Sequence, residues 1–355
     1  MSHSVKSSFL AKAIFTFVIA SFLLVVVATQ TNQLGIQSIP LAELKAKYTD
    51  EESEFISVNG LDVHVKDEGE GPVIVMLHGI LSSLHTWDGW ADELKKDYRV
   101  VRMDLPYFGL TGAPDTEKFD DKFVLDTVVK VLKEKGVEKA TFIGNSFGGW
   151  VSWRLAVNEP ELVERVILSD AKSFPQDWPW PLQLVVLPPV PDLAEYITPR
   201  FAVSIGIHMV YGDNDKITAE TIDAYHELIL RKGNRRAMMQ VFEYFFSQGG
   251  RDSQPEAGIF DVQQPLMTQW GSADDWVPMY VAKQWHQHYP NAKHVVIENA
   301  GHVPMEEVPE ESISSVQEFL CETDAELGYQ CAGAIMAADG EQEVFSRSES
   351  GNGLN

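Results

Sequence analysis

The chain has few cysteines, few basic residues and no internal repeat. Two of its 355 residues are cysteines, which excludes a disulfide-rich scaffold, and the spacing of Cys321 and Cys331 matches no zinc site. These two cysteines either form a disulfide that fastens the C-terminal tail to the last helix or remain as thiols. Lys and Arg total 28 against 52 Asp and Glu, a formal net charge of -24. A surface of this sign repels polyanions, so we expect no nucleic-acid partner.

One N-terminal stretch lacks charge altogether. Ala13 to Ala28 is apolar and follows Lys6 and Lys12. Its length lies between that of a signal-peptide core and that of a membrane-spanning helix. Cleavage after Ala28 would release the protein, whereas an uncleaved helix would give membrane contact through this segment. Both alternatives predict export, with the body of the protein in the periplasm, outside the cell or anchored outside the cytoplasm.

Short apolar runs and helical patterns alternate through most of the chain. Alternating residues on both sides of Asn59-Gly60 predict a hairpin, and Val73 to Leu77 predicts a buried strand. Further apolar runs, separated by helical patterns, predict an α/β fold with a mostly parallel central sheet and helices on both faces. Between Ala171 and Val262 the alternation stops. A proline-rich stretch and helical patterns there predict a helical cap inserted over the sheet.

The predicted organisation is a core that is interrupted once, by the cap. Its parts are residues 1–30, a signal peptide or membrane anchor; 31–52, a linker; 53–170, the first part of the core; 171–262, the helical cap; 263–322, the second part of the core; and 323–355, a disordered tail.

The stretch Gly144-Asn145-Ser146-Phe147-Gly148 follows a predicted strand and precedes a predicted helix. In this context a G-x-S-x-G segment forms a sharp turn that exposes the serine hydroxyl at the end of the strand. The glycines remove side chains that would collide in the turn. Taken alone, the segment is also compatible with a glycine-rich turn that contains an incidental serine. The strand-turn-helix context favours Ser146 as a catalytic nucleophile.

A serine nucleophile needs a base, and the base needs a carboxylate that orients it. Of the ten histidines, His302 is placed best, because it follows the last predicted strand and reaches the carboxyl edge of the sheet. Asp274, in the loop after another strand, is the preferred carboxylate. Asp170, which ends the strand before the cap, is the second candidate, and Asp275 is expected to be a solvated residue at a helix start.

Backbone N–H groups near Ser146 are expected to bind the negative charge that develops during catalysis. The stretch LHGILSS follows an early buried strand. We expect the N–H groups of Ile80 and Phe147 to form this oxyanion hole, and His78 to shape the turn.

Over residues 54–320 the chain resembles the α/β-hydrolases that carry a helical cap. The resemblance rests on motifs in matching order, namely HGILSS, DLPYFGLTG, GNSFGG, WGSADDWVP and GHVPMEEVPE. It implies the triad Ser146, Asp274 and His302, in the chain order of this fold. Within the fold, the chain is similar to exported bacterial serine esterases and lipases and, more loosely, to C–C bond hydrolases. The C–C bond hydrolases have an aromatic residue where this chain has Val303.

The resemblance and the motifs together predict a serine hydrolase that cleaves carboxylic esters through an acyl-enzyme, with no metal or organic cofactor. Trp178 and Trp180 are predicted to line an acyl-chain pocket under the cap for a small hydrophobic ester. Tyr107 replaces a glycine of the family motif DLPGFG, and we expect it to narrow the entrance or reshape the loop. The alternatives are a C–C bond hydrolase, an acyltransferase or perhydrolase, and a non-catalytic binding protein with a hydrolase frame.

Overall fold

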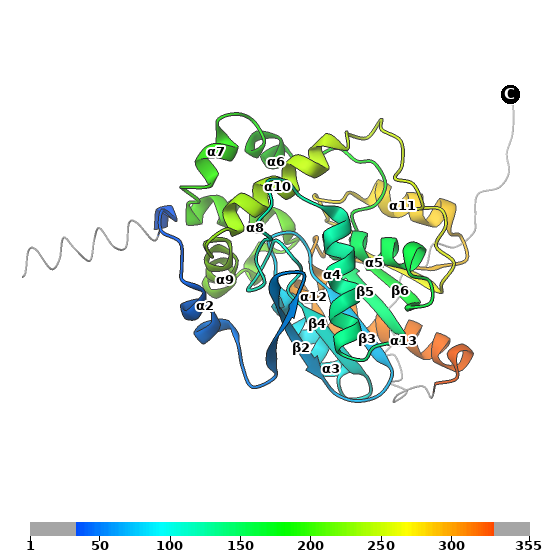
Figure 1. The fold of residues 1–355 in the computed structure, drawn as a ribbon. Helices are drawn as coiled ribbons and strands as arrows, with labels where there is room; N and C mark the ends of the chain where they lie inside the picture. The colour runs from blue at the N-terminus through cyan, green and yellow to red at the C-terminus, as the bar shows by residue number, and fades with distance from the viewer. Residues whose placement is uncertain (1–32, 330–355) are drawn as a thin grey trace, which may run out of the picture.

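The computed structural model describes residues 33–329, with an eight-stranded sheet at its centre (Figure 1). The strands lie in the order β1-β2-β4-β3-β5-β6-β7-β8, and neighbours from β4 to β8 are parallel. β2 is antiparallel to β1 and to β4, and Asn59 and Gly60 form the predicted hairpin turn with φ of 52° and 78°. The predicted mostly parallel sheet is therefore confirmed. The strands are β1 Ser53–Val58, β2 Leu61–Glu68, β3 Val73–Leu77, β4 Arg99–Met103, β5 Ala140–Asn145, β6 Val163–Ser169, β7 Leu266–Gly271 and β8 Lys293–Ile297.

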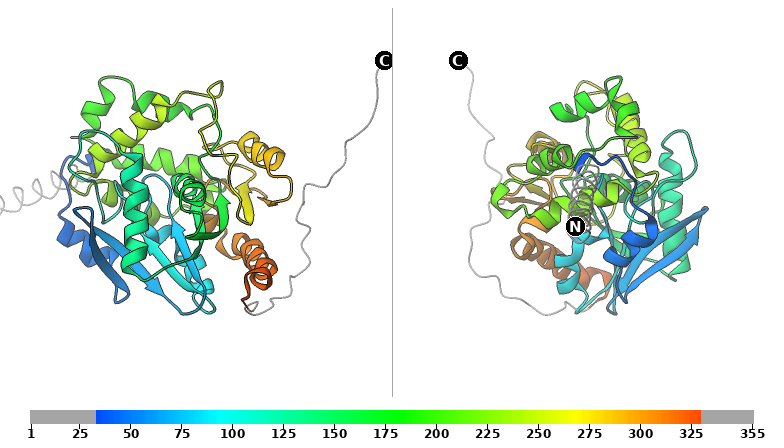
Figure 2. Two further views of the ribbon diagram at one scale, coloured as in Figure 1. Left: turned by 45° about the vertical axis from the view of Figure 1, so that its right-hand side comes forward. Right: turned by 90° about the vertical axis from the view of Figure 1, so that its left-hand side faces the viewer.

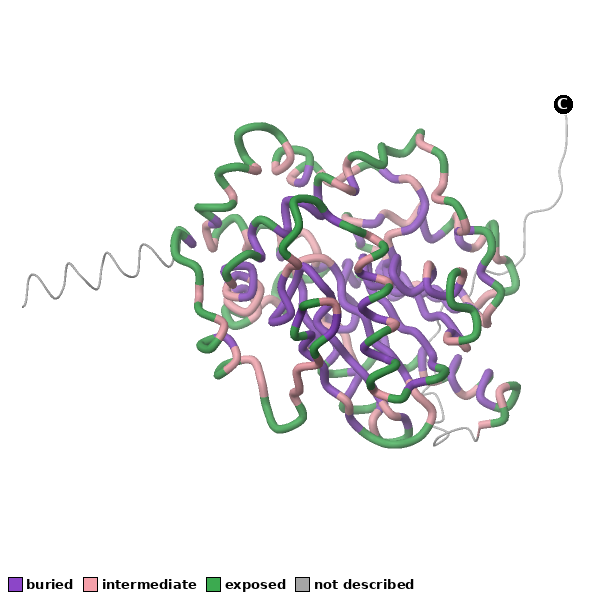
Figure 3. The backbone as a smooth tube through the Cα atoms, viewed as in Figure 1, coloured by how far each residue is buried: buried purple, intermediate pink, exposed green. Residues whose placement is uncertain are grey.

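Alternate residues of the central strands pack into two separate hydrophobic layers. In β3, Val75 and Leu77 belong to one layer, whereas Ile74 and Met76 belong to the other. Helices α4, α5 and α11 contribute buried residues to the first layer, and α3 and α13 to the second. Because both faces are covered, the strands are buried apolar runs, which Figure 3 shows as a purple centre. These helices are α3 Asp88–Leu94, α4 Asp121–Glu134, α5 Phe147–Asn158, α11 Met279–His288 and α13 Pro309–Leu327.

The helical insertion between β6 and β7 is also confirmed. Its helices lie together at one end of the molecule, above the sheet in the views of Figures 1 and 2. They have a small core of their own, in which Leu182 packs with Ile229, Met238, Met239 and Phe242. The cap helices are α6 Trp180–Val185, α7 Val190–Ala194, α8 Arg200–Val210, α9 Ala219–Ile229 and α10 Asn234–Ser247.

The predicted linker before β1 contains a packed helix. Helix α2 spans Leu41–Tyr48, and its Leu44 is buried against Leu110 of the core and Leu228 of the cap. Ile39 N–H donates to the carbonyl of Leu230 at 2.9 Å, which ties the same segment to the end of α9. The predicted linker therefore contains a helix with one buried leucine, which the polar composition of the stretch did not indicate.

The terminal predictions have different outcomes. No helix within residues 33–329 is long and apolar enough to cross a membrane, so the predicted transmembrane helix is not found there. The stretch 13–28, for which it was predicted, lies outside the described residues. Cys321 on α13 is disulfide-bonded, whereas Cys331 lies outside the described residues. Helix α13 continues to Leu327, past the predicted end of the core at residue 322, and the tail from residue 330 is not described.

Candidate active site

Ser146 lies in the turn between β5 and α5, where the sequence places it. Its φ of 52° is in the left-handed region, which raises the energy of a non-glycine residue. A Cβ on Gly144 would lie 2.3 Å from the carbonyl oxygen of Gly148, and one on Gly148 would lie 1.9 Å from that of Leu77. The glycines of the motif are therefore required by close backbone approach, and the strained turn is the price of presenting the serine at the strand end.

His302 and Asp274 are joined by a hydrogen bond. His302 Nδ1 donates to Asp274 Oδ2 at 2.8 Å, and both side chains are buried. The other oxygen of Asp274 accepts from the backbone N–H groups of Trp276 at 2.7 Å and Val277 at 3.0 Å. The backbone thus fixes the carboxylate, and the carboxylate in turn fixes the imidazole with its Nδ1 protonated, so that Nε2 remains available as a base.

Asp170, the second candidate, lies beside this pair without bonding to the histidine. It accepts from Gly271 N–H at 2.8 Å and from Ser169 Oγ at 2.9 Å. Burial raises the pKa of the Asp170 carboxyl well above its usual range, and the charge of Asp274 raises it further. We therefore assign the proton of this buried carboxyl pair to Asp170. Asp275 is exposed.

Two polar side chains that the sequence did not single out hold His302 in place. Asn145, the residue before Ser146, donates its side-chain N–H to the carbonyl of His302 at 2.9 Å. Glu307 accepts from the N–H groups of Gly301 at 2.8 Å, Gly212 at 3.0 Å and Asp213 at 2.7 Å. The loop of His302 is therefore bonded both to the serine turn and to the chain that leaves α8. The only sequence signal that could have pointed to Glu307 is the presence of acidic residues shortly after the motif GHVP.

The two predicted oxyanion donors are near Ser146 and have no competing acceptor. Ile80 lines the same cavity as Ser146, and Phe147 is the first residue of α5. Within the described residues, neither backbone N–H donates to another protein group. His78 accepts from Leu105 N–H at 2.9 Å and contacts the carbonyl of Gly79 at 2.7 Å. Burial lowers the pKa of His78. This histidine is therefore neutral and stabilises the turn through its hydrogen bonds.

A cavity of about 340 Å³ opens between the cap and the strand ends. Ser146, His302 and Trp178 line it, together with aliphatic and aromatic residues of the cap. Trp180 does not line it: this side chain is 60% exposed on the outer surface of α6. The prediction for Trp180 is therefore wrong, because α6 begins at this residue and turns it away from the cavity to solvent.

Tyr107 does not narrow the entrance. Its side chain is fully buried, packs on Phe119 with ring centroids 4.9 Å apart, and accepts from the backbone N–H of Asp120 at 3.0 Å. Its φ of 81° suits the glycine of the family motif. The ring of Tyr107 thus packs in the core, although its backbone is strained. The substitution reshapes the loop and does not narrow the cavity entrance.

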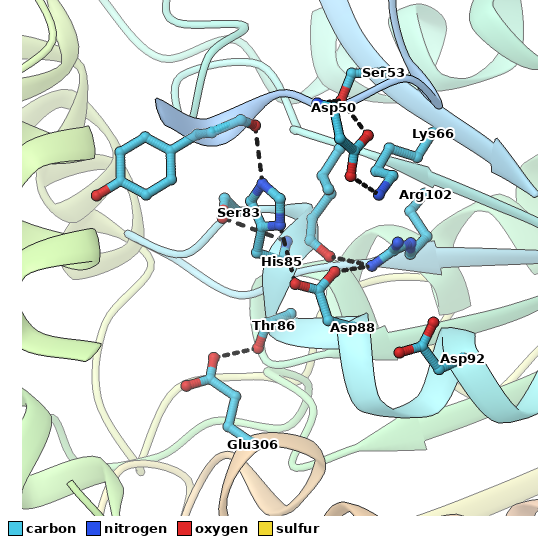
Figure 4. Close-up of polar contacts among 12 residues, drawn as sticks. Asp50, Ser53, Lys66, Ser83, His85, Thr86, Asp88, Asp92, Arg102 and Glu306 are labelled. Carbon is cyan, nitrogen blue, oxygen red and sulfur yellow. Dashed lines mark hydrogen bonds and ion pairs between the residues drawn. The ribbon is translucent and has the colours of Figure 1, made fainter. Parts of the chain in front are cut away.

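A second cavity, of about 300 Å³, adjoins the first and shares Leu81, Ser82 and Tyr225 with it. Glu306 lies in its wall and accepts a hydrogen bond from Thr86 of the core (Figure 4). It also accepts from Tyr225 at 2.7 Å and Tyr211 at 2.8 Å on the cap side. Burial raises the pKa of the Glu306 carboxyl. This group joins cap and core close to His302.

Asp170, Asp274 and His302 also place potential metal-ligand atoms within 4.8 Å of one another. Each carboxylate oxygen among them already accepts a hydrogen bond from an N–H or O–H donor. These bonds suit an orienting carboxylate and its support better than a set of metal ligands.

Comparison with known proteins supports the likeness in fold. A family model described as alpha/beta hydrolase fold matches residues 72–309. Pimeloyl-[acyl-carrier protein] methyl ester esterase of Nitrosomonas europaea is 27% identical over 261 residues, which cover 71% of this chain and 97% of that protein. 2-Hydroxy-6-oxo-6-(2'-aminophenyl)hexa-2,4-dienoic acid hydrolase of Metapseudomonas resinovorans is 26% identical over 290 residues, 78% of this chain and 95% of that protein.

Among solved structures, a membrane phospholipase A described as a bacterial virulence factor is similar with a TM-score of 0.66. It is 21% identical, and the match covers 89% of this chain and 98% of that chain. At this identity the likeness shows the fold alone.

Proposed function

Because the chain belongs to the α/β-hydrolase family, we propose that it is a serine hydrolase that cleaves carboxylic esters through an acyl-enzyme. The observation that carries this proposal is the hydrogen bond of 2.8 Å between His302 and Asp274, at a cavity that Ser146 and His302 both line. Ser146 is the nucleophile, His302 the general base, and Asp274 the residue that orients the imidazole and stabilises its cation.

The reaction proceeds in two steps, formation of the acyl-enzyme and its hydrolysis. His302 Nε2 takes the proton of Ser146 as Oγ bonds to the ester carbonyl carbon, and the same proton passes to the alcohol as the carbon–oxygen bond breaks. Water then loses a proton to His302 and attacks the acyl carbon, and the proton returns to Ser146 as the acid leaves. The N–H groups of Ile80 and Phe147 receive the oxyanion in both steps, and each is worth on the order of 3 kcal/mol.

The cavity wall supports a largely hydrophobic substrate. Its cap side consists mainly of aliphatic and aromatic side chains, among them Trp178, Leu182, Met239 and Phe242. Such a wall removes acyl or alcohol carbon from water, which favours binding in proportion to the apolar area buried. One relative is named a methyl ester esterase and one structural neighbour a phospholipase, which fits hydrolysis of an ester.

C–C bond hydrolysis with the same triad is the second candidate. It is favoured by the relative named as a dienoic acid hydrolase, which matches this chain over a longer stretch than the esterase does. The side chain that follows His302 argues for the ester: Val303 lines the cavity where the C–C bond hydrolases have an aromatic residue.

The test is a panel of nitrophenyl esters of increasing acyl length, run beside a ring-fission dienoic acid, with purified protein and Ser146→Ala. We expect ester hydrolysis in the unaltered protein and its loss in Ser146→Ala. Turnover of the dienoic acid alone would establish the second candidate. Equal ester hydrolysis in Ser146→Ala would contradict both.

A further inference from the structure

One basic side chain lines the otherwise mainly apolar cavity. Among the described residues that form the wall, Lys172 is the only Lys, Arg, Asp or Glu. An ammonium group placed in such surroundings is costly unless hydrogen-bond acceptors or an opposite charge compensate for it. Lys172 could not be predicted from the sequence, because it belongs to none of the motifs.

The backbone of Lys172 lies directly beside the nucleophile. Its N–H donates to the carbonyl oxygen of Ser146 at 3.0 Å, so the loop after β6 is bonded to the serine turn. The ammonium lies 5.6 Å from the ring centroid of Phe245, which also lines the cavity. The charge is therefore held at the same wall as the catalytic groups.

The protein leaves this ammonium poorly satisfied. Within residues 33–329 its one hydrogen bond goes to the carbonyl of Ser173 at 3.4 Å, although an ammonium has three donors. Glu256, the carboxylate that acts on Lys172 through its charge, accepts from Trp150 at 2.7 Å and pairs with Arg154 at 3.3 Å. Burial lowers the pKa of Lys172 to about 8, and the charge of Glu256 opposes this shift.

Two residues of the cavity wall each have a buried polar atom without a hydrogen-bond partner within residues 33–329. Gln176, four residues along the same loop, donates its side-chain N–H to the carbonyl of Trp276 at 2.7 Å, but its buried Oε1 has no hydrogen-bond partner within the described residues. The buried indole N–H of Trp276 has none either. Both residues line the cavity, and the Trp276 ring stacks over His302 with centroids 6.2 Å apart. Both atoms are shielded from solvent, so the Lys172 ammonium is the charged donor that the cavity offers to a ligand.

We propose that Lys172 is a specificity residue that binds a carboxylate on the substrate, so that the preferred esters are half-esters of dicarboxylic acids. The proposal rests on the proposed ester hydrolysis and names its substrate class. A carboxylate would accept charge-assisted hydrogen bonds from the Lys172 ammonium, while the carbon chain between carboxylate and ester lies against the apolar wall. The net charge of -24 on the whole chain makes one local cation more important for an anionic ligand.

The experiment compares matched pairs of esters in the full protein. Monomethyl succinate, glutarate and adipate are paired with methyl esters of neutral monocarboxylic acids of the same carbon number. The quantity measured is the ratio of kcat/KM for the half-ester to that for its neutral partner. We expect this ratio to exceed one for at least one chain length, to fall about tenfold to hundredfold in Lys172→Met through a rise in KM, and to recover in Lys172→Arg.

The pH dependence of this ratio separates a charge from a packing effect. The unaltered protein should lose its preference as pH rises through about 8, because the Lys172 ammonium then deprotonates, while Lys172→Arg should keep its preference to higher pH. The other titratable groups near Lys172 are Glu256 and, at the same cavity, His302 and Tyr225. Their titration acts on both esters of a pair, so it largely cancels in the ratio.

The outcomes distinguish the two proposals. A ratio that is unchanged in Lys172→Met, or a fall that is equal for both esters, would overturn the carboxylate site and leave ester hydrolysis standing. Absence of any Ser146-dependent ester turnover would instead overturn the proposed function.

Discussion

At the residue scale, the site depends on which of two adjacent carboxyls faces the histidine. The motifs located Ser146 and His302 from sequence, because each needs a short local pattern at a strand end. They favoured Asp274 over Asp170 only by its loop motif. The hydrogen bond to His302 assigns the orienting contact to Asp274, and the raised pKa of Asp170 explains how two carboxyls share this buried place.

We predict opposite results for the two carboxyls. Asp274→Asn should lower kcat for an ester by a factor on the order of 10⁴, because an amide N–H facing His302 favours the wrong imidazole tautomer. Asp170→Asn should keep kcat within about tenfold, since an amide replaces a carboxyl that is already neutral. Steady-state kinetics of both variants test this assignment of the two carboxyls. Thermal unfolding shows whether both variants fold. A larger loss in Asp170→Asn than in Asp274→Asn would reverse the assignment.

The positions of some other side chains could not be predicted from the sequence, for a physical reason. Trp178 and Trp180 are two residues apart, yet only Trp178 lines the cavity, because the direction of each side chain is set by where α6 begins and by the proline turn before it. Lys172 and Gln176 are recognisable only once the cap loop lies against the strand ends. Such contacts depend on tertiary packing, which local patterns do not encode.

At the scale of elements, the loop of His302 is held by α12, Pro304–Glu307, as much as by β8. Glu307 bonds this loop to the chain after α8, and Glu306 bonds the same short helix to Tyr211 and Tyr225 of the cap. The position of His302 is therefore coupled to the position of the cap. The sequence predicted the strand and the helices but not these bonds, because they join segments about 90 residues apart.

Removing the Glu307 carboxylate should disturb both stability and catalysis. Glu307→Ala leaves the buried N–H of Gly301 without an acceptor, and we expect the free energy of unfolding to fall by about 1–3 kcal/mol. A small displacement of His302 should lower kcat/KM by about tenfold or more. Glu310→Ala, at an exposed position of α13, is the control. Equal unfolding midpoints in denaturant and equal kinetics for the two variants would contradict this role.

The segment before β1 contains helix α2, which was not predicted from the sequence. A single buried residue, Leu44, is too weak a pattern to predict a packed helix, although α2 contacts both core and cap. Asp50, which follows α2, pairs at 2.6 Å with the nearly buried ammonium of Lys66 on β2 (Figure 4). Partial burial acts to raise the pKa of Asp50, but the hydrogen bond and charge of Lys66 outweigh it and lower this pKa to about 2.

This pair predicts a pH-dependent contribution to stability. Because the pKa of Asp50 is lower in the folded protein, the pair stabilises the fold above pH of about 4 and loses this effect as pH falls toward 2. Asp50→Asn should lower the free energy of unfolding by about 1 kcal/mol at pH 7, a value kept small by the partial exposure of Asp50. The difference from the unaltered protein should shrink between pH 4 and pH 2 in urea unfolding. A difference that is constant with pH would show that the charge pair is not its cause.

At the scale of the whole molecule, the sequence predicted the architecture well because it follows from repeated local patterns. Buried β-branched runs, helices between them and one long interruption specify a parallel sheet with a cap. Export stays a prediction, and the disulfide at Cys321 fits it, because disulfides persist in oxidising compartments. The intact mass of the secreted or periplasmic protein, compared with the mass expected after cleavage at Ala28, tests the prediction of export.

The central claim is that folding activates Ser146 through His302 and Asp274. Its most direct test is covalent labelling with a fluorophosphonate, read by intact mass and peptide mapping, beside Ser146→Ala and His302→Ala. We predict one adduct on Ser146, none in Ser146→Ala, and labelling slowed by orders of magnitude in His302→Ala. Folded protein in which Ser146 remains unlabelled, or is labelled equally fast without His302, would contradict the account.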